Sequence, residues 1–386
     1  MSRVYLDYNA TSPLHPDVQR AMSEVSQLGP LNPSSMHAEG RRARQIWDEA
    51  RQRIADALDC AAARVVITSG GTEANNLAIQ GLVQIRRGPV LVSAVEHPSV
   101  LEVAESYRSL GREVIRIPVD DQGVVILSAL EELLDGDPPP ALVSVMTANN
   151  ETGVLQPTAD IASRCEMHGV PLHCDAVQSA GKLPWPLSME AGWLMSISGH
   201  KLEGPAGIGA LVCSPDIELP PLLRGGNQQS GWRAGTEPVA LAVGLATALE
   251  RWQAHGSDWL DQLRSGQRAF EQLLTERIPG AVILGRRAAR LPHTTQAAFP
   301  GRDRQALLMG LDLTGIACST GSACSSGSSE VSHVLRAMGV PELVCEGALR
   351  FSWGPLTERS DLERAVGELE RLCRHRGGSA EGPADG

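Results

Sequence analysis

The sequence predicts an α/β protein with a mostly parallel sheet of seven strands, helices on both faces of that sheet, and a second, smaller α+β domain. Two observations carry this prediction. Apolar runs of strand length alternate with helical segments between residues 64 and 213, and short polar clusters directly follow several of these runs. Such alternation builds a parallel sheet covered by helices, and ligands of such sheets gather at the carboxyl ends of the strands.

The elements are expected in the following order. A first helix is expected over residues 37–58, after a Pro- and Gly-rich loop at residues 29–37. The seven strands are expected at V-V-I-T (65–68), P-V-L-V-S-A-V-E-H (89–97), E-V-I-R-I-P-V (113–119), A-L-V-S-V-M-T (141–147), V-P-L-H-C-D (170–175), W-L-M-S-I-S (193–198) and G-I-G-A-L-V-C (207–213). Helices are expected after Ser69, at 98–110, 128–134 and 158–168, and later at 240–277 and 330–338.

The chain of 386 residues is long enough for two domains. We assign residues 15–256 to a large domain and residues 1–14 together with 257–373 to a small one. The Gly-, Pro- and Ala-rich acidic stretch 374–386 is expected to be a disordered tail.

Bulk composition limits the classes of partner. The hydrophobic share of 42% predicts a sizeable core, and the net charge of -11 argues against a nucleic-acid or anionic-membrane surface, both of which need a basic patch. The N-terminus lacks the apolar run of a signal peptide and no apolar stretch approaches membrane-spanning length, so we expect a cytoplasmic protein with small-molecule or protein partners.

The eight cysteines form no C-x-x-C pair, which disfavours a zinc ribbon or a disulfide framework. We expect free thiols and no bound metal.

Lysine is almost absent from the chain. Only Lys182 and Lys201 are lysines among 34 basic residues. Arginine stays protonated and forms no imine, so a retained lysine indicates carbonyl chemistry, although codon usage alone could also leave two lysines. Lys201 follows the strand at 193–198 and is the better candidate, whereas Lys182 lies in a Gly-Lys-Leu-Pro turn and is expected to be exposed.

Five polar clusters lie just past strand ends and should converge on one crevice. They are residues 69–72, His97, residues 149–150, Asp175 and residues 198–201. A carboxylate and a lysine at neighbouring strand ends suit pyridoxal phosphate (PLP), because the acid keeps the pyridine nitrogen protonated while the lysine forms a Schiff base. A buried ion pair is the alternative for Asp175 and Lys201, and a satisfied strand-end histidine is the alternative for His97.

Two glycines precede the helix that follows Ser69, so backbone N–H groups there can approach a phosphate at the positive end of the helix dipole. A tight turn explains the same pattern. The segment lacks the G-x-x-x-x-G-K of a nucleotide P-loop, which disfavours ATP.

Residues 319–329 are nearly all small, which predicts an exposed, mobile loop that carries Cys324. The helix expected at 330–338 would lower the pKa of that thiol, and an accessible thiol on a flexible arm suits a nucleophile that carries a group away. Cys318 is a second candidate thiol but is more typical of a packed residue. Arg350 lies in an apolar, strand-like run and needs a carboxylate partner, which an amino-acid substrate or a protein Asp or Glu would supply equally well.

Over residues 4–360 the chain resembles the cysteine desulfurases of the NifS type, which belong to the class V aminotransferase-like group of PLP enzymes with the type I PLP-dependent transferase fold. The motifs that carry the resemblance are N-P-S-S-x-H, T-S-G-G-T-E-A-N-N-L-A, E-H-P-S-V-L, A-N-N-E-T-G, D-A-V-Q-S, S-G-H-K, R-A-G-T-E, C-S-T-G-S-A-C-S-S-G-S and L-R-F-S.

The resemblance implies roles for individual residues. Lys201 would hold PLP, Asp175 would pair with its pyridine nitrogen, Gln178 would contact its phenolic oxygen, and Asn150 would lie beside it. The phosphate would be bound by Gly71, Thr72, Ser198 and His200, with Thr236 reaching across from the second subunit of a homodimer. His97 would stack on the ring and help move protons, and Asn32 and Arg350 would hold the substrate carboxylate. Cys324 would take the sulfur of L-cysteine as a persulfide, release L-alanine and pass the sulfur to an acceptor or iron–sulfur scaffold protein. The same thiol could also ligate a transient iron–sulfur cluster.

The chain departs from the family pattern at G-G-N-Q-Q-S-G (225–231), at Pro355 and in the opening D-Y-N-A-T-S. These departures leave Lys201, Asp175 and Cys324 in place but put partner or dimer contacts in question. A selenocysteine lyase or another class V transaminase or lyase is the alternative activity, and a non-enzymatic thiol or metal carrier is the alternative class.

Overall fold

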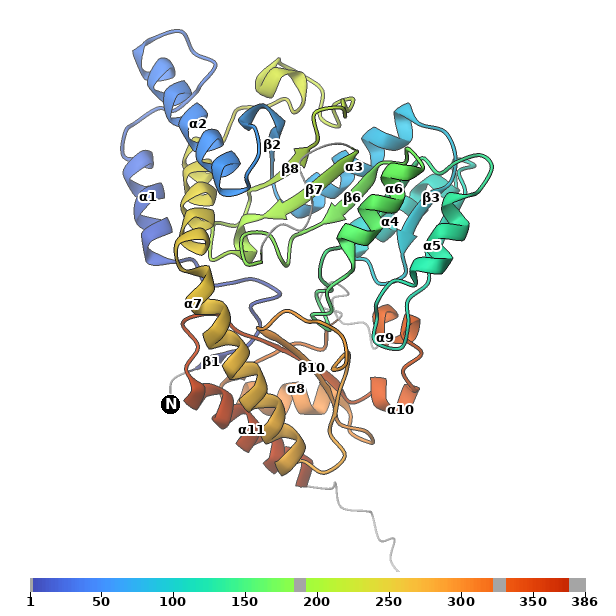
Figure 1. Ribbon diagram of the computed structural model, residues 1–386. Coiled ribbons are helices and arrows are strands. Elements are labelled where there is room, and N and C mark those ends of the chain that lie inside the picture. The colour runs from blue at the N-terminus through green and yellow to red at the C-terminus, as the bar shows by residue number, and fades with distance from the viewer. Residues whose placement is uncertain (1–2, 184–191, 322–330, 375–386) are drawn as a thin grey trace, which may run out of the picture.

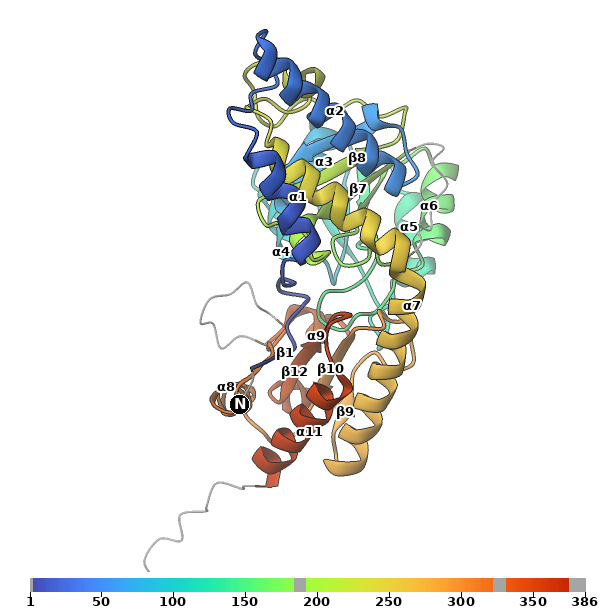
Figure 2. The same ribbon diagram turned by 90° about the vertical axis from the view of Figure 1, so that its left-hand side faces the viewer.

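The structure is a computed structural model that describes residues 3–183, 192–321 and 331–374. Figure 1 shows a large part, built on a seven-stranded sheet, above a smaller part with its own short sheet. The long helix α7 (Val239–Arg277) runs along both parts, as the turned view in Figure 2 also shows. The predicted domain boundary at residues 256 and 257 therefore falls inside one continuous helix.

The large sheet has the strand order β2-β8-β7-β6-β5-β3-β4. These strands are β2 (Val65–Thr68), β8 (Gly209–Cys213), β7 (Trp193–Ser198), β6 (Leu172–Asp175), β5 (Leu142–Ser144), β3 (Val90–Ser93) and β4 (Val114–Ile117). β8 is antiparallel to both of its neighbours, while the pairs from β7 to β4 are all parallel. The predicted mostly parallel sheet of seven strands is confirmed.

Alternate residues of each strand enter different cores, as the two-residue period of a strand requires. Val66 of β2 packs in the core that contains α3 (Gly71–Ile85) and α4 (Pro98–Arg108), whereas Val65 and Ile67 pack in the opposite core. That second core contains α2 (Ala38–Ala57), α5 (Leu127–Leu134), α6 (Thr158–Met167) and the first half of α7. Helices thus cover both faces, and the carboxyl ends of the parallel strands stay open toward the small part.

The small part is a three-stranded antiparallel sheet of order β12-β10-β9, with a separate parallel pair, β1 and β11. Its strands are β1 (Val4–Tyr5), β9 (Val282–Ile283), β10 (Thr294–Ala298), β11 (Ile316–Ala317) and β12 (Ala348–Ser352). Its helices are α8 (Arg304–Leu313), α9 (His333–Ala337), α10 (Glu342–Cys345) and α11 (Arg359–Arg374). The chain's first strand therefore belongs to the small part, which brings the segment after it to the boundary between the two parts.

Four described helices, α1, α8, α10 and α11, have no counterpart among the predicted ones, and α9 begins later than expected. The patterns above indicate no element at α1 (Pro16–Ser26), where Val18 is the fully buried residue and Ala21, Met22 and Val25 are partly buried against the core. The helix expected at 330–338 begins later, at His333, because the Ser332 side chain accepts a hydrogen bond from the Leu335 N–H and caps the helix there.

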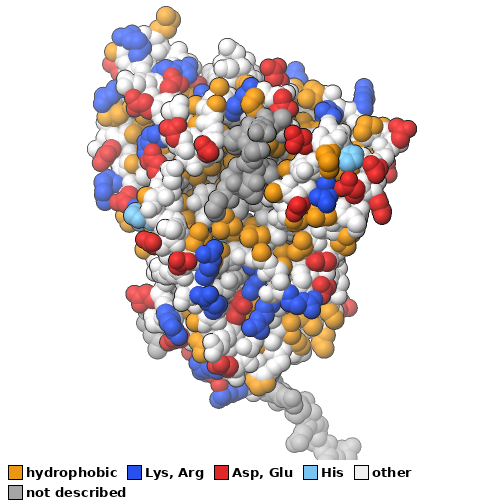
Figure 3. Space-filling model, viewed as in Figure 1, with side chains coloured by type: hydrophobic (Ala, Val, Ile, Leu, Met, Phe, Trp, Pro, Cys, Tyr) orange, Lys and Arg blue, Asp and Glu red, His pale blue; other side chains and the backbone are white. Residues whose placement is uncertain are grey.

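The surface carries charges of both signs. On the face drawn in Figure 3, basic and acidic side chains lie interspersed, with apolar side chains between them. No helix within the described ranges has both the length and the apolar character to cross a membrane.

Candidate active site

A cavity of about 760 Å³ lies at the carboxyl ends of the parallel strands, where the small part faces the large sheet. Ten of the predicted site residues line it together: Gly71, Thr72, His97, Asn150, Asp175, Gln178, Ser198, His200, Lys201 and Arg350. They come from positions spread over 280 residues of sequence, from 71 to 350. The fold therefore brings the strand-end clusters into one crevice.

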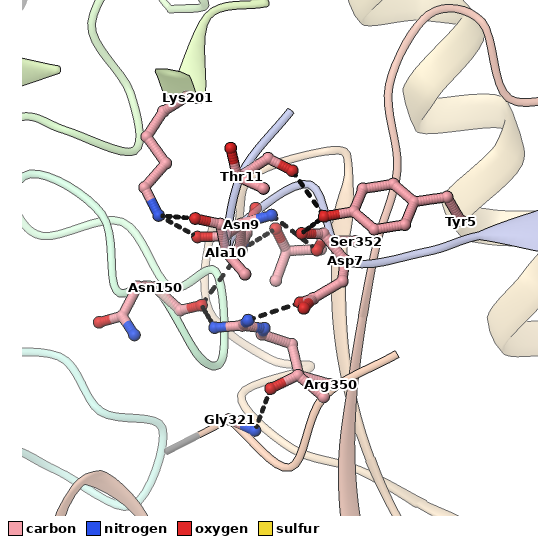
Figure 4. A network of polar contacts seen from close by, with 12 residues as sticks. Tyr5, Asp7, Asn9, Ala10, Thr11, Asn150, Lys201, Gly321, Arg350 and Ser352 are labelled. Carbon is pink, nitrogen blue, oxygen red and sulfur yellow. Dashed lines mark hydrogen bonds and ion pairs between the residues drawn. The ribbon is translucent and has the colours of Figure 1, made fainter. Parts of the chain in front are cut away.

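Lys201 ends the short 3-10 turn η2 (Gly199–Lys201) that directly follows β7. Its Nζ donates hydrogen bonds to the backbone carbonyls of Asn9 at 2.5 Å and Ala10 at 2.7 Å. Figure 4 shows the amine pointing toward these two carbonyls of the N-terminal segment. A primary amine is thus held in the cavity by neutral acceptors.

Asp175 is the last residue of β6, and its side chain is buried. One carboxylate oxygen, Oδ1, accepts from the Val177 N–H at 3.0 Å, and the other, Oδ2, accepts from the Asn75 amide at 2.8 Å. These neutral donors orient the carboxylate without neutralising it, so its negative charge is available to the cavity. Sequence reasoning named Asp175 but not Asn75, since the two lie 100 residues apart.

His97 is the N-cap residue of α4, and it is half-buried. Its Nδ1 accepts from the Ser99 N–H at 3.1 Å and lies 2.8 Å from the Ser99 Oγ. Burial lowers the pKa of this imidazole, and the charge of Lys201 lowers it further against the opposing effect of Asp175. A neutral imidazole is therefore favoured at this position.

The glycine-rich turn before α3 approaches its neighbours closely. Gly70 has a φ of 153°, and a Cβ on Gly71 would lie 2.6 Å from Cγ2 of Val177. Side chains are absent here because there is no space for them, and the first N–H groups of α3 are left open to the cavity. His200, which also lines the cavity, stays neutral because burial and the nearby lysine charges lower its pKa to about 4.

Arg350 is buried in β12, as the sequence predicts, and it has a protein carboxylate as a partner. Its guanidinium forms an ion pair with Asp7 at 2.7 Å and donates to the Asn150 carbonyl at 3.0 Å. Figure 4 shows the guanidinium lying between these two groups. Its Nε, which is also buried, has no hydrogen-bond partner among the described residues.

The prediction that Lys182 is exposed is wrong. Only 5% of Lys182 is exposed, and its Nζ lies 3.4 Å from Nε2 of the buried His293. Burial and the charge of Lys201 lower the pKa of Lys182 to about 7. His293 lies 111 residues away in the sequence, so the local turn motif gives no sign of this contact.

Two predicted site residues within the described ranges do not line the cavity. Asn32 and Thr236 are exposed in the single chain. Cys324 and residues 322–329 of the loop predicted to carry it lie outside the described residues, as do residues 375–386 of the predicted tail. The start of that loop is not exposed as predicted, because Ser319 and Gly321 are buried, and Arg374 of the predicted tail ends α11. Cys318 is described, and burial raises its pKa to about 12, so its thiol stays protonated at neutral pH.

Sequence reasoning missed four titratable residues that line the cavity: Glu102, Glu151, His333 and Arg336. Glu151 is buried, burial raises its pKa, and its Oε2 accepts from the Ser332 hydroxyl at 2.6 Å. His333 lines the cavity from the start of α9 and donates from Nε2 to the Glu96 carbonyl at 2.9 Å. Glu151 lies inside the motif A-N-N-E-T-G, which is the signal that could have found it.

Comparisons with known proteins place this geometry in a family. Residues 4–365 match the model of the aminotransferase class-V family, so the chain belongs to that family. It is 38% identical to the cysteine desulfurase IscS of Dictyoglomus turgidum over 96% of this chain and 94% of that one. Two solved structures are similar to this chain. The first is a NifS-like protein with 31% identity and a TM-score of 0.89, and the match covers 96% of this chain and 99% of that one. The second is a NifS-like protein from Rickettsia africae with 33% identity and a TM-score of 0.84, and the match covers 96% of this chain and 99% of that one.

Enzymes of this family use PLP, and the residues of the cavity fit that cofactor. Lys201 offers the primary amine, and the two hydrogen bonds to Asp175 hold a carboxylate that can face a ring nitrogen. Gln178 also has a buried Oε1 without a hydrogen-bond partner among the described residues, at the position where a cofactor hydroxyl is expected. Gly71 and Thr72 line the cavity at the N-terminus of α3, where the helix dipole and the first N–H groups favour a phosphate.

Proposed function

We propose that this protein is a PLP-dependent cysteine desulfurase that converts L-cysteine to L-alanine and takes the sulfur as a persulfide on Cys324. The observation that carries the proposal is one cavity that holds Lys201, Asp175, His97 and Arg350 in a chain whose relatives are named cysteine desulfurases. Each of these groups has a separate task in such a reaction.

When bound, PLP draws electrons away from the α-carbon of an amino acid. Asp175 would hold the ring nitrogen in its protonated form, and Gln178 would contact the ring hydroxyl through its unpartnered oxygen. Gly71, Thr72, Ser198 and His200 would bind the phosphate. Asn150 would lie beside the ring and His97 above it.

Lys201 would hold the cofactor before the substrate arrives and then remove the α-proton of cysteine with its free amine. The Asn9 and Ala10 carbonyls accept from this amine and orient it in the cavity. The buried Lys182 places another amine in the same region, and each positive charge there disfavours the other.

Arg350 would bind the substrate carboxylate, together with Asn32. Its pairing with Asp7 supports this, because the ion pair fixes the guanidinium at the cavity wall and the buried Nε keeps a donor unused. A carboxylate that arrives here meets an oriented donor set.

Cys324 would attack the substrate sulfur as a thiolate. A new S–S bond forms, the C–S bond breaks, and the three-carbon remainder takes up a proton and leaves as alanine. Cys318 is excluded from this role at neutral pH because burial keeps its thiol protonated.

We further propose a cytoplasmic homodimer in which Thr236 reaches the phosphate bound by the other subunit. The exposure of Thr236 in the single chain supports this arrangement. The persulfide sulfur would pass to an acceptor or scaffold protein for iron–sulfur cluster assembly or thiolation. Nucleic acid and membranes are not expected partners.

The test uses the PLP-loaded enzyme with L-cysteine and an excess of thiol reductant. Alanine and sulfide should form in equal amounts. The variant C324S should lose sulfide release while it keeps the visible absorption of bound PLP, and C318S is the matched control that should retain both. Sulfide release by C324S equal to that of the parent protein would rule out the proposed thiol.

A selenocysteine lyase or another class V transaminase or lyase is less favoured, because the relatives reported above carry the names of cysteine desulfurases or NifS-like proteins. Comparing turnover of cysteine and selenocysteine distinguishes the first alternative, and transfer of the amino group to a keto acid distinguishes the second.

A further inference from the structure

A hydrogen-bonded series of four side chains connects Asp175 at the end of β6 with His97 at the start of α4. The Asn75 Nδ2 donates to Asp175 Oδ2 at 2.8 Å and also to Ser99 Oγ at 2.8 Å. Ser99 Oγ in turn lies 2.8 Å from His97 Nδ1. Asn75 is 1% exposed, so neither of its donor bonds competes with bulk water.

Donors and acceptors in this hydrogen-bonded series can be assigned because one of its contacts has a single possible direction. A backbone N–H only donates, and the Ser99 N–H points at His97 Nδ1, so Nδ1 is an acceptor. The Asn75 Nδ2 also only donates, so Ser99 Oγ receives from Asn75 and has its own hydrogen left for His97 Nδ1. A neutral His97 therefore carries its proton on Nε2.

We infer that Asn75 and Ser99 are positioning residues that lock His97 in the Nε2–H tautomer and fix it relative to the carboxylate of Asp175. This inference rests on the proposed function for its meaning in catalysis. The locked imidazole offers a donor at Nε2, and it accepts a further proton only by giving up the hydrogen bonds from Ser99 at Nδ1. His97 is thereby prepared to give a proton or a hydrogen bond within the cavity it lines.

Charged groups on four other elements act on His97. They are Asp175 on β6, Lys201 after β7, His333 on α9 and Arg350 on β12. Asp175 favours the protonated imidazole, whereas the other three disfavour it. Asn75 and Ser99 carry no charge, so their removal changes the hydrogen bonds of His97 and leaves this set of charges in place.

The first test is the tautomer of His97 in the PLP-loaded enzyme, read from nitrogen chemical shifts of isotope-labelled histidine, with H97Q used to assign the signal. We expect a protonated Nε2 and an unprotonated Nδ1 at neutral pH. A protonated Nδ1 would overturn the inference. This measurement needs no turnover, so it tests the tautomer even if cysteine is not the substrate. If the parent enzyme forms no alanine from cysteine, only the proposed function is refuted.

The second test compares N75L, S99A and S99T, with N76A as the control on the same helix. N75L should lower kcat roughly ten- to a hundredfold, with KM changed by less than about threefold, because positioning acts on the bound reactants. S99A should also lower kcat, and S99T, which keeps the hydroxyl, should recover most of it. In N75L and S99A the nitrogen signal of His97 should broaden or move toward that of a tautomer mixture. If S99A has the same His97 signal and the same kcat as the parent enzyme, the inference is overturned, even if N75L fails to fold.

Discussion

The buried Lys182 gives a prediction that can be worked out from the structure. Its pKa is lowered from 10.5 to about 7, because the amine is enclosed and close to the charge of Lys201. The unfolded chain therefore binds more protons than the folded one between about pH 7 and pH 10.5. Stability must rise with pH across that window, since the free energy of unfolding increases wherever the unfolded state holds more protons.

The magnitude follows from the two pKa values. Between pH 7 and pH 9 the Lys182 contribution to the free energy of unfolding should rise by about 2 kcal/mol, at ~1.4 kcal/mol for each pH unit in which the folded amine is neutral and the unfolded one charged. Glu96 acts in the opposite direction, because burial raises its pKa to about 8 and its deprotonation destabilises the folded state. The difference between the parent protein and K182M cancels the Glu96 effect and isolates Lys182.

The direct assay uses the scarcity of lysine in this chain. Isotope-labelled lysine gives only two side-chain signals, and K182M assigns them. We expect the Lys182 signal to titrate near pH 7 in the PLP-loaded enzyme. The free energy of unfolding of the parent should rise by about 2 kcal/mol relative to that of K182M between pH 7 and 9. A Lys182 signal that stays in its protonated position up to pH 10 would refute the reasoning.

Three further predictions follow from the site. D7N should lower the free energy of unfolding by about 1–3 kcal/mol in denaturant titrations, because it leaves the buried Arg350 without its carboxylate. D312N breaks the exposed pair with Arg3 and should change the free energy of unfolding by less than about 0.5 kcal/mol. Equal effects of the two substitutions would contradict the burial argument. G71A should weaken PLP binding by roughly tenfold or more in equilibrium dialysis, since its Cβ would meet Val177 at 2.6 Å, while G256A, where the nearest atom is 4.0 Å away, should bind PLP normally. K201A should lose the visible absorption of lysine-bound PLP, and a spectrum identical to that of the parent would reject Lys201 as the cofactor-holding amine.

The parts of the site that could be predicted are those set by local sequence and by the rule for parallel strands. Asp175 ends β6 and Lys201 lies three residues past the end of the neighbouring strand β7, so their convergence follows once the sheet is recognised. The glycine turn before α3 is likewise local, because the missing side chains are visible in the sequence itself.

The parts that could not be predicted depend on residues brought together by the tertiary fold. Asp7 and Arg350 lie 343 residues apart, and nothing near Asp7 indicates that it would meet a buried guanidinium. The turn motif at Lys182 is typical of exposed loops and predicts a surface residue, yet its amine is buried beside His293. Spacing along the chain does not report such contacts.

The measurement that tests the central claim most directly is mass analysis of the PLP-loaded enzyme after one turnover with L-cysteine in the absence of reductant. We predict that the peptide containing Cys324 gains the mass of one sulfur atom, that one alanine is released for each sulfur gained, and that C324S shows no such gain. Alanine release with no added sulfur on Cys324, or fragmentation of that peptide that places the added sulfur on Cys318, would contradict the account.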